Sequence, residues 1–395
     1  MSSRWCRRTC ASCCPRRSAR RWPAPRRSAR ALRTLVVSDL HLGAHGWPDV
    51  LRAPEGLAAL TRALGEFDRL VLLGDLIELR HGPLRAALAA AAEPLGALAQ
   101  ALAPGAEVVI VPGNHDHQLV EPWTQRLAVD APPSALEPEV AVDWRDGEPL
   151  ARLAQLLAPA RVRAAYPGVW LRDDVYATHG HYLDLHMTVP TLERLGAGAM
   201  RRIVALDGAG PRAVEDYEAV LAPIYAWIHA LAQRADPDRS GLLHGGSVRG
   251  WRALTGPGRR RGVRGRAVAI AWPVGVRVLN ALGIGPLRSE LTGAELRRAG
   301  LRAFEQVLER LPIAADHVIF GHTHRAGPLA GDVTSEWRTA LGVRLINSGC
   351  WVREPAFQGP DPSSSPYRPG FGVVVSDDGP PRLVNLLDEP SAAAT

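Results

Sequence analysis

The sequence contains no lysine, so all 47 of its basic residues are arginine. It also has no aspartate or glutamate in its first 33 positions, although 11 of the arginines lie there. Beyond that segment, 36 arginines stand against 40 acidic residues, which gives a formal charge of −4. A nucleic-acid-binding fold is expected to carry a basic face of its own. The positive net charge therefore belongs to the first segment, and we expect no nucleic-acid partner.

Cysteine is almost absent after the first segment, where Cys350 is the only one. The fold therefore does not depend on a disulfide framework. The chain also lacks a clean apolar run of the length that a membrane-spanning helix needs, and its first residues lack the apolar core of a secretory signal. We accordingly expect a cytoplasmic protein with a disordered, Arg-rich tail at residues 1–33 and a flexible C-terminus at residues 390–395.

From residue 34 onward, short apolar runs bounded by turn residues alternate with helical stretches. The pattern predicts strands at residues 35–38, 69–73 and 107–111, with helices at 55–67 and 83–102 between them. This alternation favours an α/β fold with parallel strands. Further strands are predicted at residues 169–171, 175–178, 317–320, 344–347, 371–376 and 382–387.

The strand pattern stops between residues 185 and 311. This stretch predicts helices at about residues 191–206, 213–235 and 293–311, with a loop rich in Gly and Arg at 240–266. We interpret residues 185–311 as a mainly helical cap insertion. The core of the fold would then consist of residues 34–184 and 312–389.

Residues 267–287, within the insertion, are strongly apolar, yet Pro273, Arg277 and Asn280 argue against a helix that spans a membrane. Two interpretations remain open. The segment is either a buried part of the cap or an apolar lip that contacts a membrane or an acyl chain. The arginines that precede it suit anionic lipid, so the second interpretation predicts peripheral contact with the inner face of the membrane through residues 259–287.

Five short polar motifs each follow a predicted strand. They are Ser38-Asp39-Leu40-His41, Gly74-Asp75-Leu76-Ile77-Glu78, Gly113-Asn114-His115-Asp116, Thr178-His179-Gly180 and Gly321-His322-Thr323-His324. Each motif alone is typical of an ordinary turn. Side chains at the carboxyl ends of neighbouring strands converge on one crevice, however, so the five together predict a single site.

The chemical types in these motifs indicate a particular class of cation. Carboxylate, amide oxygen and imidazole together suit Mn²⁺, Fe²⁺ or Zn²⁺. Asp39 and His41 are two positions apart, so on an extended chain both point to the same side. The carboxylate of Asp75 can bridge two ions, and Asn114 offers a neutral oxygen. Glu78 could support a ligand or lie in a solvated loop, and the residues alone leave both readings open.

In this order, the five motifs resemble those of the calcineurin-like metallophosphoesterases. The resemblance implies a two-sheet sandwich flanked by helices and a binuclear centre, with Mn²⁺ expected first and Fe²⁺ or Zn²⁺ as alternatives. It implies that His115 is the catalytic acid and that Asp116 orients it. The metal ligands that it implies are Asp39, His41, Asp75, Asn114, His179, His322 and His324.

A closer likeness is to the UDP-2,3-diacylglucosamine pyrophosphatases, which share the segment ending in Glu78 and a helical insertion before the last motif. The chain departs from them at His115, where they usually have Arg, and at His181, where they usually have Asp. We therefore leave the substrate open between a phosphorylated small molecule and a lipid-linked one.

The expected reaction is hydrolysis of a phosphate ester or pyrophosphate bond by direct attack of a hydroxide that bridges the two ions. One alternative is a membrane-associated pyrophosphatase acting on a lipid-linked substrate. An alternative of another class is a non-catalytic scaffold. A scaffold is expected to have lost ligands, and none of the seven is missing here.

Overall fold

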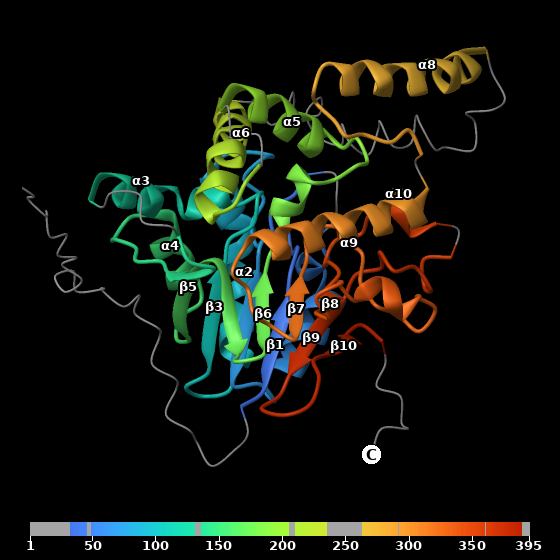
Figure 1. The fold of residues 1–395 in the computed structure, drawn as a ribbon. Helices are drawn as coiled ribbons and strands as arrows, with labels where there is room; N and C mark the ends of the chain where they lie inside the picture. Colours follow the sequence, from blue (N-terminus) through green and yellow to red (C-terminus); the bar gives the residue numbers. More distant parts are fainter. Residues whose placement is uncertain are drawn as a thin grey trace, which may run out of the picture. The chain divides into compact units, whose positions relative to one another are not determined.

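The computed structural model describes residues 32–45, 49–130, 136–204, 210–234, 263–290, 292–359 and 361–388. The predicted C-terminal tail and all but residues 32 and 33 of the predicted N-terminal tail lie outside these ranges. Figure 1 shows strands and helices alternating around a large sheet. The strands are β1 (Thr34–Val37), β2 (Arg69–Leu73), β3 (Glu107–Val111), β4 (Glu139–Ala141), β5 (Arg161–Arg172), β6 (Val175–Thr178), β7 (His317–Phe320), β8 (Arg344–Asn347), β9 (Phe371–Val375) and β10 (Arg382–Asn385).

These strands form one hydrogen-bonded order, β10-β9-β1-β2-β3-β5-β6-β7-β8, and β4 pairs with β5. Strands β1, β2, β3 and the first part of β5 are parallel, as are β6, β7 and β8. The long strand β5 pairs with β3 through residues 161–164 and with β6 through residues 168–172. The predicted α/β class with parallel strands is therefore confirmed. The predicted two-sheet sandwich is not confirmed, because β5 pairs with strands of both halves and joins them in one hydrogen-bonded order.

Side chains alternate between the two faces of each central strand. In β1, Leu35 and Val37 join one buried cluster, whereas Val36 joins another. In β7, Phe320 packs toward the helices while Ile319 joins the same cluster as Val36. This shared cluster draws side chains from both halves of the sheet. The period of two along a strand thus buries both faces of the sheet, which explains the continuous apolar runs in the sequence.

Helices cover both halves. Those packed in the first cluster are α1 (Pro54–Leu64), α2 (Leu84–Ala101), α3 (Glu121–Asp130) and α4 (Pro149–Leu156). On the other half, α9 (Gly293–Arg310) places Phe304 against Phe320 of β7 with 4.4 Å between the ring centres. Short helical turns complete the chain: η1 (Val50–Arg52), η2 (His117–Leu119), η3 (His181–Leu185), η5 (Thr334–Trp337) and α10 (Pro355–Gln358).

The segment between β6 and β7 contains no strand in its described part. Its long helices are α5 (Leu192–Val204), α6 (Val214–Arg234), α8 (Val263–Ala281) and α9. The predicted helices at 191–206, 213–235 and 293–311 are thus confirmed. The apolar stretch at 267–287 proves to be largely helical as well. None of the helices in the described ranges combines the length and the apolar character needed to cross a membrane.

Candidate metal centre

The five polar motifs meet where their strands end. Strand β1 is followed by Asp39 and His41, β2 by Asp75, β3 by Asn114, β6 by His179 and β7 by His322 and His324. All of the seven predicted ligands are brought into one cluster by the contacts described below. The side chains of Asp39, His41, Asp75 and His179 are almost completely buried, and those of His322 and His324 are only slightly exposed.

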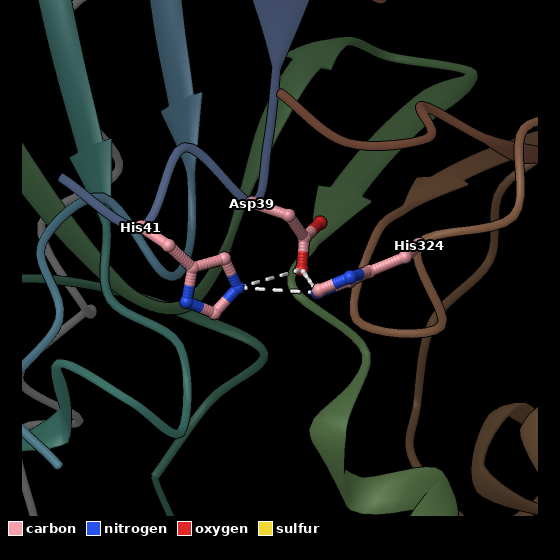
Figure 2. A group of neighbouring side chains, drawn as sticks. All are labelled: Asp39, His41 and His324. Atoms are coloured by element: carbon pink, nitrogen blue, oxygen red, sulfur yellow. Dashed lines mark hydrogen bonds and ion pairs between the residues drawn. The ribbon is translucent and has the colours of Figure 1, made fainter. Parts of the chain in front are cut away.

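The first group of side chains comprises Asp39, His41 and His324. Figure 2 shows the Asp39 carboxylate between the two imidazole rings. The Nε2 atoms of His41 and His324 are 3.1 Å apart. Oδ1 of Asp39 lies 3.3 Å from Nε2 of His324 and 4.0 Å from Nε2 of His41. This Oδ1 is buried and makes no hydrogen bond within the described part of the chain. Three potential ligand atoms therefore face one small space.

The second group comprises Asp75, Asn114, His179 and His322. Nε2 of His179 lies 3.2 Å from Oδ2 of Asp75 and 3.1 Å from Oδ1 of Asn114. Nδ1 of His322 lies 3.1 Å from the same Asn114 oxygen. Oδ2 of Asp75 is also 3.7 Å from Nε2 of His41. Asp75 therefore stands between the two groups, at the position that a bridging carboxylate would occupy.

The outer nitrogens of the first group are held by carboxylates. Nδ1 of His41 is 3.1 Å from Oε2 of Glu78, and Nδ1 of His324 is 3.5 Å from Oε2 of Glu354. An ionised carboxylate only accepts hydrogen bonds, so each Nδ1 carries the proton in the neutral ring. In the neutral rings, the inner Nε2 atoms, 3.1 Å apart, are the lone-pair nitrogens that a shared divalent cation would use. Carboxylate support of this kind is usual for metal-bound histidine.

The second group follows the same rule. Nδ1 of His179 donates to the backbone carbonyl of Leu73 at 3.1 Å, which leaves Nε2 as the lone-pair nitrogen. Nε2 of His322 lies 2.9 Å from Oδ1 of Asp184, which leaves Nδ1 facing Asn114. In the neutral rings, Nε2 of His179 and Nδ1 of His322 therefore both face the Asn114 amide oxygen with a lone pair. An amide oxygen cannot donate a hydrogen bond to either of them. The donor set of carboxylate, amide oxygen and imidazole fits a borderline divalent cation.

The backbone at these positions adopts an unusual conformation. In the described ranges, the non-glycine residues with positive φ are Asp39, His41, Asp75, His322 and His324, with φ between 44° and 66°. Left-handed backbone is costly for residues with a side chain and persists where surrounding structure enforces it. All five are predicted ligands, so the local strain is concentrated where the side chains converge.

Electrostatic pairing shifts the acidity of the cluster. Burial acts to raise the pKa of Asp75, but His179 and His115 outweigh it and hold the pKa well below the usual range. Burial acts to lower the pKa of His179, but Asp75 and Asp39 raise it to about 9. The pKa of His324 is raised well above its usual value, because Asp39 and Glu354 outweigh burial. Carboxylates and imidazoles are thus paired by charge, and a cation would compete with the imidazolium protons.

The predicted partnership between His115 and Asp116 is not what the structure shows. Nδ1 of His115 lies 2.7 Å from Oε2 of Glu78. The Asp116 carboxylate instead accepts from the backbone N–H groups of Leu76 and Gly113, each at 2.7 Å. Because a buried carboxylate must satisfy its oxygens, Asp116 ties the two loops together. Glu78 takes the orienting position, which corrects the assignment made for Asp116.

Sequence reasoning missed Arg80. Its Nη1 lies 3.2 Å from Nε2 of His115, and its Nη2 donates to the backbone carbonyl of Asn114 at 3.1 Å. The supporting carboxylates Asp184 and Glu354 were missed too. Arg80 and Asp184 lie close in sequence to Glu78 and His179. Their closeness to these motifs could have indicated that they support the site. Glu354 stands apart from every motif, and nothing in the sequence pointed to it.

The fold and the site define an α/β protein in which candidate ligands for divalent metals gather where the strands end. A family model described as calcineurin-like phosphoesterase matches residues 32–244, which is more than half of the chain. The chain belongs to the calcineurin-like phosphoesterase family, whose members use divalent metals. The match contains four of the five motifs, and His322 and His324 lie beyond it. A search of curated proteins found no match.

Proposed function

We propose that this protein hydrolyses a phosphate ester or pyrophosphate bond at a centre of two divalent cations. The observation that carries the proposal is the pair of ligand groups joined by Asp75, whose Oδ2 lies 3.7 Å from His41 Nε2 and 3.2 Å from His179 Nε2. When bound, two such cations supply charge to stabilise the phosphoryl oxygens and activate water for attack.

The ligand assignment follows from the two groups. Asp39, His41, Asp75 and His324 would hold one cation; Asp75, Asn114, His179 and His322 would hold the other. Mixed oxygen and imidazole donors favour Mn²⁺, Fe²⁺ or Zn²⁺, and we propose Mn²⁺ first. A non-catalytic scaffold is disfavoured because the complete set of predicted ligands converges.

The chain's own residues suggest how the leaving group is protonated. Glu78 orients His115 through Nδ1, so Nε2 is the nitrogen that would carry a proton to the leaving oxygen. Nε2 now faces Arg80, which only donates. The substrate must therefore draw the guanidinium away from this nitrogen. A phosphoryl oxygen offers Arg80 a charged acceptor and would do so.

The insertion contributes contacts to this side of the centre. Tyr225 of α6 stacks on Arg80 with 5.4 Å between the guanidinium carbon and the ring centre. Glu193 of α5 lies 3.6 Å from Nη1 of Arg80. These contacts support the proposal that residues 185–311 act as a cap on a core of residues 34–184 and 312–389. They also support a role of α5 and α6 in the choice of substrate.

The proposal is tested by Asp75→Asn. We expect the variant to lose both cations and turnover, because the carboxylate that joins the two groups is gone. Metal content by elemental analysis and hydrolysis of a nitrophenyl phosphate with added Mn²⁺ are the measurements. Asp68→Asn, a change of the same kind before β2 and outside the cluster, is the control. Full activity in Asp75→Asn would overturn the proposed centre.

The substrate is a separate proposal. The monoester, the diester and the pyrophosphate are the alternatives, and the predicted likeness to UDP-2,3-diacylglucosamine pyrophosphatases is the reason to include a lipid-linked pyrophosphate among them. A hydrolysis panel would compare a nitrophenyl monoester, a bis-nitrophenyl diester and nucleotide-sugar pyrophosphates, each with several divalent cations. Preference for the simple esters over every pyrophosphate would remove the lipid-linked alternative.

A further inference from the structure

The end of α8 exposes a row of apolar side chains. Val274 and Val278 of α8 and Leu282, the residue after it, follow at intervals of four residues and are 53%, 51% and 51% exposed. Side chains at this spacing lie on the same side of a helix. Val276, by contrast, is 4% exposed and packs against the protein. We call Val274, Arg277, Val278 and Leu282 the α8 surface.

The position of α8 is set by contacts on its other sides. Asn280 Nδ2 donates to the carbonyl of Leu287 at 2.9 Å, and its Oδ1 accepts from the N–H of Leu287 at 2.7 Å. Trp272 Nε1 donates to the carbonyl of Ser289 at 2.9 Å. These bonds tie the helix to the chain that follows it. With these bonds formed, the side chains of Val274 and Val278 stay exposed.

Arginines accompany this surface in the sequence. Residues 263–289, which include α8 and the chain that follows it, contain four arginines and no aspartate or glutamate. Arg277 is exposed within the α8 surface itself, and the side chain of Arg288 is 60% exposed. Arg202 of α5 bonds to the carbonyl of Leu282, which brings the end of that helix alongside. Figure 1 shows α8 beside α5 and away from the strands.

This combination selects one kind of occupant. An apolar row bordered by arginines matches the interface of a bilayer, where acyl chains meet anionic headgroups. We infer that the α8 surface docks the protein on anionic phospholipid bilayers. The inference does not depend on phosphoester hydrolysis, because none of these residues belongs to the metal cluster.

The test is flotation of the full chain with vesicles of phosphatidylcholine, with or without phosphatidylglycerol, at low and high salt. We expect binding only to the vesicles with phosphatidylglycerol, weakened by salt. Val274→Asp with Val278→Asp should lower the partition coefficient by at least about tenfold. Arg277→Glu should lower it by at least about fivefold, because each arginine near such a surface contributes about that factor.

Matched controls are available on the same chain. Val333 and Leu341 are 55% and 67% exposed but lie between β7 and β8, so Val333→Asp with Leu341→Asp should bind as the unaltered protein does. The Arg-rich residues 1–33 are present in every variant and cancel from the comparison. Thermal unfolding shows whether each variant is folded.

Three outcomes would overturn the inference. The unaltered protein could fail to float with phosphatidylglycerol at low salt. Both double variants could lose binding equally, which would indicate nonspecific attraction. Alternatively, sedimentation velocity could show a dimer that Val274→Asp with Val278→Asp dissociates, and the occupant would then be a second copy. Each result is independent of whether Asp75→Asn abolishes hydrolysis.

Discussion

At the scale of single residues, Glu78 has two tasks. Its Oε2 lies 3.1 Å from Nδ1 of His41 and 2.7 Å from Nδ1 of His115. The pKa of Glu78 is held well below its usual value, because His115 and His81 outweigh the effect of burial. An ionised carboxylate at this point orients a proposed ligand and the proposed acid together. The sequence left Glu78 open between this role and a solvated loop.

The role of His115 gives a prediction at this scale. His115→Ala should keep its metal content, because the imidazole is not among the seven proposed ligands, while turnover falls about 10²–10⁴-fold. The fall should be largest for alkyl phosphates, whose leaving oxygens need a proton most. Elemental analysis and rates across a series of leaving groups are the measurements. If metal content fell in parallel with the rate, the proposed role of His115 would be wrong.

At the scale of elements, the turns after the strands are tightly packed. A Cβ on Gly113 would lie 2.4 Å from Oδ1 of Asp75 and 2.7 Å from Cδ2 of His179. Glycine is therefore required after β3 so that the loops from β2 and β6 can approach. The clustering of the ligands thus depends on backbone that leaves room for them.

Gly113→Ala tests this packing. We expect it to displace Asp75 or His179, to lower metal affinity by at least about tenfold and to cost about 1–3 kcal/mol of stability. Gly96→Ala is the matched control, since a Cβ there meets nothing within 4 Å and lies in α2. That change should be neutral or stabilising by about 0.5–1 kcal/mol. Metal titration and urea unfolding distinguish the two.

Helix α6 is anchored through a buried carboxylate. Oε1 of Glu218 accepts from the hydroxyls of Tyr166 and Tyr182 at 2.6 and 2.5 Å, and Oε2 lies 2.9 Å from Nε2 of His117. Burial acts to raise the pKa of Glu218, but His117 and the tyrosine hydroxyls outweigh it and hold the pKa below its usual value. The insertion is therefore bound to the core by polar contacts close to the site.

This anchor predicts a pH dependence. The pKa of Glu218 is depressed in the folded chain. Its contribution to the free energy of unfolding is therefore fully present above its pKa in the unfolded chain, about 4.3, and is lost as the pH falls through its pKa in the folded chain. Glu218→Gln should cost about 1.5–3 kcal/mol near neutral pH. The difference from the unaltered protein should shrink as the solution is acidified. Urea unfolding across this pH range measures the difference, and Glu55→Gln, at an exposed position, is the control. A stability difference that does not change with pH would contradict an ionised Glu218.

At the scale of the whole molecule, the centre joins segments from far apart in the chain. Ligands follow β1 at one end of the sequence and β7 near the other, and β5 connects the two halves of the sheet that carry them. Cations bound between these segments should therefore stabilise the fold as a unit.

Metal removal tests this link. Mn²⁺ at about 100 times its dissociation constant should stabilise the chelator-treated protein by about 2.7 kcal/mol per site, raising its unfolding temperature. Binding should strengthen as pH rises, because cations displace protons from His179 and His324, whose pKa values are raised. Calorimetric scans with and without Mn²⁺ check both points. Asp75→Asn should show no such shift.

The limits of sequence reasoning show in particular segments. Strand β5 was predicted only from residue 169 onward, because its earlier part contains arginines and Pro167, which disfavour a strand. Pairing with β3 and β4 overrides that local preference. Likewise, Glu354 supports His324 from a loop with no local signal. Such contacts depend on the sheet order, which periodicity alone does not specify.

The sequence by itself determined the α/β class, the order of the central strands and helices, and the seven residues whose types suit divalent cations. It could do so because the spacing of apolar residues and the chemical type of each side chain are local properties of the sequence. Only the tertiary structure decided that one hydrogen-bonded order joins both halves, that Glu78 rather than Asp116 faces His115, and that Arg80 lies against that imidazole. Those outcomes depend on distances between separate segments, and such distances exist only once the chain has folded.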